Sequence, residues 1–369
     1  MQDVQKNSPF YFKLACILIS IIALCYIAIF TKELLSPLIF SCLFSMVLLP
    51  LANFFENKWR LHRGLAAIIS VLLLLSFVIL ILYFIGSQIS KLSNDWPQFQ
   101  NQLNTTIGKT QLYIENALDI KVSKQMVYVH QATSKLLSSS AVMATATLLS
   151  ISSILLFLIF TFIYTFFFLL YRRLIKRFLL VVFKDENKIV VNDVIECVQS
   201  MIRKYIIGLF SEMAIVATVA CLAFWALGIK YSILLGLITG IFNIIPYLGI
   251  FIAMIISVII TFATATIVSK TLLVFITIVI IHLIDSNVLL PLIVGSKVRI
   301  NALITVLGVI IGELLWGISG MFLSIPIIAV LKIIFDRIES FKPWGMLMGE
   351  EAEGIKILEK RMLKRKLKI

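Results

Sequence analysis

The stretch GLITGIFNIIPYLGIF, Gly236 to Phe251, places three glycines, one asparagine and one proline inside the most hydrophobic half of the chain. Proline removes a backbone donor and clashes with the preceding helical turn, and glycine weakens a helix. Non-helical backbone at membrane depth is tolerated only where protein buries it or water reaches it. Secondary transporters build substrate sites from such broken helices, and a simple proline kink is the alternative. The residues that we expect to form the transport path or hinge are Gly240, Asn243, Pro246, Tyr247 and Gly249.

The composition indicates an all-α, polytopic helical membrane protein. Of the 369 residues, 60% are hydrophobic and 14% are charged, and the mean hydropathy is +1.04. Apolar runs long enough to span a bilayer recur along the chain, without the short alternating segments of a membrane β-barrel. About eight transmembrane segments are predicted, with a broken or re-entrant helix in the C-terminal half. They cover residues 10–30, 34–56, 64–86, 141–171, 205–228, 231–262, 271–290 and 302–335.

The net charge of +14 fits a membrane protein better than a nucleic-acid-binding protein, because the basic residues collect in short loops and in the tail. Three basic groups lie at Lys58–Arg63, Arg172–Arg177 and Glu359–Ile369. The positive-inside rule places them, and both termini, in the cytoplasm. Lys297 and Arg299 then fall outside, unless segment six or seven is re-entrant.

Five parts of the chain are expected. They are N-terminal transmembrane helices (1–86), a small extracytoplasmic helical insert (87–140), a transmembrane helix with a cytoplasmic amphipathic linker (141–204), a C-terminal transport core (205–335) and a basic cytoplasmic tail (336–369). The insert reads either as a gate or partner platform, or as a helical cap without chemistry.

Ionisable residues in membrane segments are costly, so each is a functional hypothesis. His282 and Asp285 are three residues apart and share a helix face, and Asn287 follows them. Such a group could carry a proton, bind a cation or hydrogen-bond a polar solute. Glu212 is a further polar or coupling candidate. The alternative for all four is hydrogen bonding that only holds the helices together.

No enzyme, cofactor or metal site is expected. The segment Gly317–Gly320 matches the GxSG of intramembrane serine proteases, but no histidine follows Ser319 to activate it. Close helix packing through Gly317 and Gly320 explains the segment better. The five cysteines lack metal-ligand spacing, and no phosphate-binding loop or HExxH motif is present.

These motifs together resemble those of the autoinducer-2 exporter family, the PerM-like bacterial permeases. The resemblance covers nearly the whole chain and is most specific after Arg203. The matching residues are Arg203, Tyr205, Gly208, Gly236, Asn243, Pro246, Tyr247, Gly249, Asn287, Pro291, Gly295, Gly317, Gly320 and Pro326. Departures from the family pattern are Ile250 for proline, Asp285 for glutamate, Asn301-Ala302 for a His-Pro pair, and Glu313 for glycine.

The resemblance implies a secondary transporter in the inner membrane of a bacterium, and it implies a homo-oligomer. Members of the family are associated with export of a small signalling molecule, with sodium or proton antiport and, in some spore-forming bacteria, with sporulation. We therefore expect a membrane permease whose partners are the lipid bilayer and a small polar solute or ion. A scaffold in envelope or spore assembly that transports nothing is the alternative from another class. The departures leave the substrate open.

Overall fold

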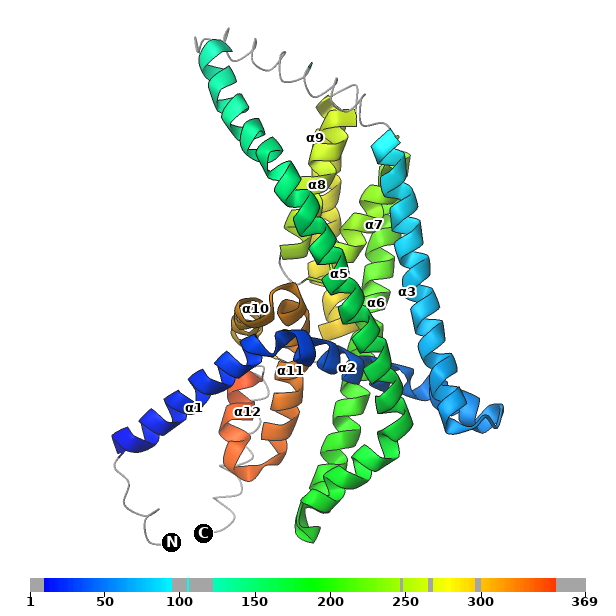
Figure 1. The fold of residues 1–369 in the computed structure, drawn as a ribbon, viewed down its shortest axis with the longest axis vertical. Helices are drawn as coiled ribbons and strands as arrows, with labels where there is room; N and C mark the ends of the chain where they lie inside the picture. The colour runs from blue at the N-terminus through cyan, green and yellow to red at the C-terminus, as the bar shows by residue number, and fades with distance from the viewer. Residues whose placement is uncertain are drawn as a thin grey trace. The chain divides into compact units, whose positions relative to one another are not determined.

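The computed structural model describes residues 10–94, 105, 122–245, 248–264, 268–295 and 300–349. It is built of helices, and these described residues contain no strand (Figure 1). The predicted all-α, multi-pass fold is confirmed. Within the predicted insert, residues 95–104 and 106–121 lie outside the described residues. The division of the chain into five functional parts stays a prediction.

Seven helices in the described residues are long and apolar enough to cross a membrane, where about eight segments were expected. These helices include α1 (Phe10–Phe30), α2 (Lys32–Lys58), α3 (Arg63–Asn94), α5 (Val122–Val182), α6 (Lys188–Ala226), α9 (Val268–Ile284) and α11 (Ile318–Arg337). Three shorter apolar helices are α7 (Ser232–Phe242), α8 (Leu248–Thr264) and α10 (Ala302–Trp316). The difference arises at the predicted segment 231–262, which is divided into α7 and α8, both too short to count as spans. The predicted segment 302–335 is also divided, into α10 and α11, but α11 still counts as one span.

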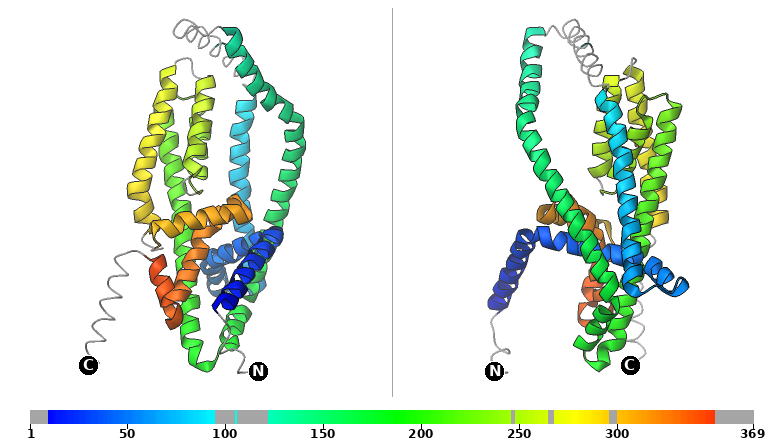
Figure 2. Two further views of the ribbon diagram at one scale, coloured as in Figure 1. Left: turned by 90° about the vertical axis from the view of Figure 1, so that its left-hand side faces the viewer. Right: turned by 45° about the vertical axis from the view of Figure 1, so that its right-hand side comes forward.

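The chain forms two compact units, which are described separately. Unit 1 comprises Met1–Trp59, Phe160–Arg203 and Val298–Ile369, and unit 2 comprises Arg60–Ile159 and Lys204–Lys297. In unit 2, α7, α8 and α9 lie side by side, as the left view of Figure 2 shows. Fully buried apolar side chains such as Phe224, Leu235 and Ile278 join α6, α7 and α9 in one core.

Gly240 lets α7 approach the unit 2 part of α6 closely. A Cβ atom at Gly240 would lie 2.7 Å from the backbone oxygen of Met213 and 2.5 Å from the Cβ of Ala217. Gly236, one turn earlier, faces Cys221 at similarly close range. The glycines of the quoted stretch therefore bring two backbones together.

The break between α7 and α8 satisfies its own backbone donors where it is described. After Phe242 the chain tightens, because Ile244 donates to the Ile241 oxygen at 3.2 Å and Ile245 donates to the Phe242 oxygen at 2.9 Å. Gly249 then donates to the Ile245 oxygen at 3.0 Å, and a side chain at Gly249 would collide with the Phe242 carbonyl. These bonds pair described backbone donors of the break, as an apolar surrounding requires.

In unit 1, α10 and α11 form a tight helical hairpin. Gly317 sits between them at φ 63° and ψ −140°, a conformation that favours glycine, with no atom near its missing side chain. Gly317 thus makes the turn, where we expected it to pack helices. Gly320 does pack closely, against the backbone of Gly312, and Pro326 is buried within α11.

Asn301 fixes the start of α10, at a position where the family pattern has another residue. Its side-chain oxygen accepts from the Ile304 amide at 3.0 Å, as an N-cap does. Its side-chain nitrogen donates to the Leu347 oxygen at 3.1 Å, and its backbone amide donates to the Met348 oxygen at 3.0 Å. Both oxygens belong to α12 (Lys342–Met348), so Asn301 ties the two helices together.

The close approach at Gly240 predicts the effect of a larger side chain there. Gly240→Leu should lower the free energy of unfolding by about 1–3 kcal/mol, because α7 must move away from α6. Gly86→Leu is the matched control, since no atom lies within 4 Å of a Cβ at that glycine. Thermal unfolding of the full chain in detergent measures both, and equal melting temperatures would contradict the packing.

Candidate functional site

Three polar side chains from separate segments of unit 2 meet at the helix break. Glu212 lies in α6, Asn243 is the C-cap residue of α7, and Asp285 opens the π-helical turn η2 (Asp285–Leu289) that follows α9. The Asn243 side-chain nitrogen donates to Asp285 Oδ2 at 3.1 Å and lies 3.5 Å from Glu212 Oε1. An amide NH2 group carries two donors, so one asparagine serves both carboxylates.

The two carboxylates are almost completely buried. Glu212 is 2% exposed and Asp285 is 5% exposed, and their side chains interact electrostatically. Glu212 Oε2 and Asp285 Oδ1 are buried without a hydrogen-bond partner among the described residues. Burying a carboxylate is costly unless hydrogen bonds or an opposite charge compensate for it. The arrangement is therefore suited to accept a proton, a cation or a donor group of a polar solute.

Asp285 faces inward because it continues the buried face of α9, where Ile278 and Ile281 precede it at helical spacing. It is the first residue of the π-helical turn, and its neighbours Ser286 and Asn287 are exposed. A π turn adds a residue to the helical repeat, and such turns are frequent at functional sites. Asn287 is exposed, and its side-chain nitrogen donates to the Leu283 oxygen at 2.8 Å. Asn287 therefore closes the turn and does not reach the two carboxylates.

His282 does not bond to Asp285, although the spacing predicts a shared face. In the described part of the chain, His282 Nδ1 is buried and has no hydrogen-bond partner. The structure instead brings Asp285 to Glu212, which lies more than 70 residues earlier in the chain. A polar role for His282 stays a prediction.

The remaining predicted path residues divide into two groups. Gly240 and Gly249 shape the backbone on either side of Asn243. Pro246 and Tyr247 lie outside the described residues. The predicted transport role of all five stays a prediction.

Tyr205 and Gly208 belong to the same region, although the sequence singled them out only through the family resemblance. Tyr205 is 2% exposed, lies two turns before Glu212 on α6 and interacts electrostatically with it. A Cβ at Gly208 would lie 3.1 Å from the Ile293 oxygen, in the second π-helical turn η3 (Pro291–Gly295). The absence of a side chain at Gly208 lets α6 approach the segment that carries Asp285.

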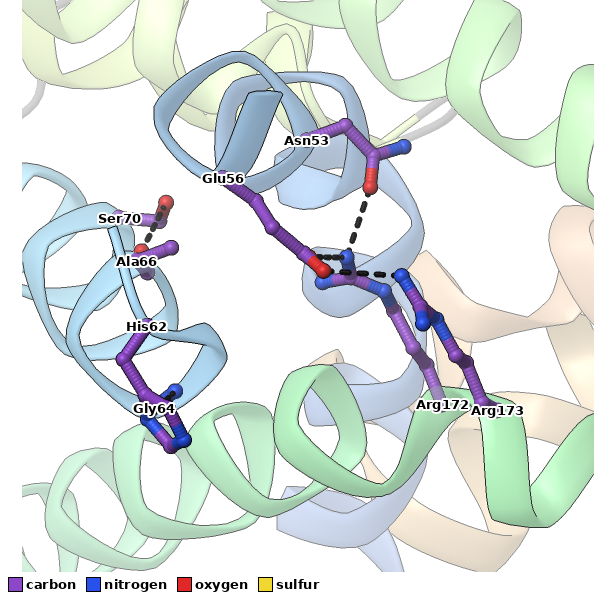
Figure 3. A network of polar contacts seen from close by, with 8 residues as sticks. All are labelled: Asn53, Glu56, His62, Gly64, Ala66, Ser70, Arg172 and Arg173. Carbon is purple, nitrogen blue, oxygen red and sulfur yellow. Dashed lines mark hydrogen bonds and ion pairs between the residues drawn. The ribbon is translucent and has the colours of Figure 1, made fainter. Parts of the chain in front are cut away.

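Unit 1 holds a different polar network, which the sequence did not predict. Arg172 donates to Asn53 Oδ1 at 2.8 Å and pairs with Glu56, and Arg173 pairs with the other oxygen of Glu56 at 2.8 Å (Figure 3). Asn53 and Glu56 are three residues apart on α2, so they face α5 together. Basic residues read only as orientation signals thus also hold α2 against α5.

The family model described as AI-2E family transporter matches residues 18–340. The chain is similar to the putative transport protein YrrI of Bacillus subtilis, with 36% identity over 130 residues, which cover 35% of this chain and 36% of that relative. It is also similar to two Escherichia coli K12 proteins. These are the AI-2 transport protein TqsA, with 24% identity over 89% of this chain and 93% of the relative, and the putative permease PerM, with 25% identity over 76% and 78%.

The site predicts that the Asn243 amide stabilises the fold. Asn243→Leu should lower the free energy of unfolding by about 1–3 kcal/mol, because it removes the donor that both buried carboxylates share. Asn287→Leu is the matched control, since that exposed side chain does not reach the carboxylates.

Thermal unfolding of both variants in detergent measures the difference. Adding Asp285→Asn to the Asn243→Leu variant should restore part of the loss, because one buried negative charge disappears. A control that is destabilised as much as Asn243→Leu would contradict the shared-donor account.

Proposed function

Because the chain belongs to the AI-2E family of transporters, we propose that it is a secondary transporter that exports a small polar solute or signalling molecule. The observation that carries this proposal is Asn243, held at a helix break between the buried carboxylates of Glu212 and Asp285. The similarity to a protein described as an AI-2 transport protein supports a solute of the autoinducer-2 kind. Such a solute offers hydroxyl groups, which carboxylates and amides bind by hydrogen bonds.

The buried carboxylates also supply a means of coupling transport to an ion gradient. When a proton or a sodium ion occupies the two unpartnered oxygens, the repulsion between the carboxylates is relieved. When the ion leaves, the site is negatively charged and attracts a solute donor or a new cation. Alternation between these two states, with movement at the break between α7 and α8, would link the two fluxes.

A sodium or proton antiporter is the second candidate. The two unpartnered oxygens favour it, because an antiporter needs carboxylates that bind its two ions in turn. In that case the cation itself is the transported species and no organic solute is required. The same residues, Glu212, Asn243 and Asp285, would serve both functions.

The surroundings of this transporter follow from its charges and its family. We place it in the bacterial cytoplasmic membrane with both termini in the cytoplasm, since the basic groups at the end of α2 and in the last turns of α5 then lie inside. We also propose a homo-oligomer, on the family resemblance alone. The lipid bilayer and a small solute or ion are its expected partners.

Transport by the purified chain in proteoliposomes tests the proposal. Vesicles loaded with autoinducer-2 should release it faster when a proton or sodium gradient is imposed. Asp285→Asn should slow this release by about tenfold or more, because a charge-assisted hydrogen bond at the site is worth about 1.5–3 kcal/mol.

Ser286→Ala is the matched control, since Ser286 is exposed on the same turn and donates only within its own helix. It should leave the rate within about twofold of the unaltered chain. Gradient-driven exchange of sodium and protons without solute release would assign the antiporter. The absence of any gradient-coupled flux would overturn both transport functions and favour a scaffold.

A further inference from the structure

A cavity of about 760 Å³ lies within unit 1, apart from the residues assigned to transport. Its walls come from α2, the end of α5, the start of α6 and the end of α11. The ends of α5 and α6 are joined by the short turn η1 (Asp185–Asn187), and both helices are green in Figure 2. The volume is in the range of ligand sites, roughly 300–1,000 Å³.

The cavity is lined mainly by aliphatic and aromatic side chains. Leu49, Leu179 and Val194 represent the contributions of α2, α5 and α6. Arg172 and Lys176 in its lining belong to the basic group that we place at the cytoplasmic surface, at the end of a helix apolar enough to cross a membrane. At that level the headgroups of the lipids meet their acyl chains. A hydrocarbon chain is therefore the occupant that matches the walls.

The charged residues at this cavity favour an anion. Three of them are basic, namely Arg172, Lys176 and Arg337, and one is acidic, namely Glu339. Glu339 is 93% exposed and faces Lys342 at 3.7 Å. The lining therefore carries an excess of positive charge.

The ion pairs of these basic residues leave them able to bind a further group. Lys176 pairs with Glu196 at 3.3 Å, and Arg337 pairs with Asp193 at 2.5 Å. Both acids are more than 60% exposed, and such pairs contribute little to stability. Arg172 is only 14% exposed and is paired with Glu56, yet its Nη1 has no partner among the described residues.

We propose that this cavity binds an acyl chain of an anionic membrane phospholipid, with the headgroup phosphate near Arg172 and Lys176. Guanidinium and ammonium groups bind phosphate by charge-assisted hydrogen bonds, and clustered basic side chains select anionic headgroups. The apolar walls of the cavity bind the acyl chain of the lipid. A lipid held this way fills the space between four helices of unit 1 and so stabilises their packing.

Photolabelling of the full chain tests this site. The chain is reconstituted in vesicles of phosphatidylcholine that contain a small fraction of phosphatidylglycerol with a diazirine on one acyl chain. After illumination, mass spectrometry should find adducts on the cavity-lining peptides of α2, α5 and α6. Unlabelled phosphatidylglycerol should compete with the label more strongly than phosphatidylcholine, and inorganic phosphate should not compete.

Two substitutions separate binding of the acyl chain from binding of the headgroup. Val194→Trp fills the cavity and should abolish adducts there, whereas Ile189→Trp, on an 82% exposed residue of the same helix, should not. Lys176→Gln should keep the adducts but lower the preference for phosphatidylglycerol by about fivefold.

Several results would overturn the proposal. Adducts confined to the exposed faces of the helices would do so, as would equal competition by phosphatidylcholine or displacement by inorganic phosphate. Cross-links between the cavity and residues 350–369 in unlabelled vesicles, formed with a short bifunctional reagent, would assign the space to the chain's own tail. The positions of the adducts on the unaltered protein test the proposal even if the Val194→Trp variant does not fold.

Discussion

The structure of unit 2 depends on two carboxylates that are buried among apolar helices with one shared amide donor. Glu212 and Asp285 come from helices distant in sequence, and Asn243 bonds to Asp285 and faces Glu212. Buried charges require such compensation, and here the compensation is incomplete, because one oxygen of each carboxylate has no partner among the described residues. The unpartnered oxygens are the reason why we propose the cluster as a binding site as well as a structural contact.

The backbone around this cluster is arranged to meet the same requirement. Gly240 and Gly208 bring neighbouring backbones close to α6, and the reversal after Phe242 pairs its own amide groups. Asp285 continues the buried face of α9 at the start of a π-helical turn, while Asn287 on the same turn bonds back to its own helix. Close packing and irregular backbone thus act together, since each allows a polar side chain to sit where regular helices would not place it.

Much of this could be predicted from the sequence. The apolar runs indicated a helical membrane protein, and Pro246 with the nearby Gly240 and Gly249 located the break. Both signals could be found because they come from residues that are close together in the sequence. The partner of Asp285 could not be found this way. Residue spacing pointed to His282, whereas Glu212 is brought close by tertiary packing that no local pattern indicates. The turn at Gly317 and the network of Arg172 with Glu56 were missed for the same reason, because a glycine can turn or pack, and an arginine can orient the chain or bind within it.

Currents on a solid-supported membrane test most directly whether the two carboxylates bind an ion during transport. Proteoliposomes of the full chain should give a transient current when the proton or sodium concentration is stepped, because ion binding at Glu212 and Asp285 moves charge into the protein. The double variant Glu212→Gln, Asp285→Asn should give no such current, although it keeps both side chains able to hydrogen-bond. A transient of unchanged size in the double variant would contradict the account.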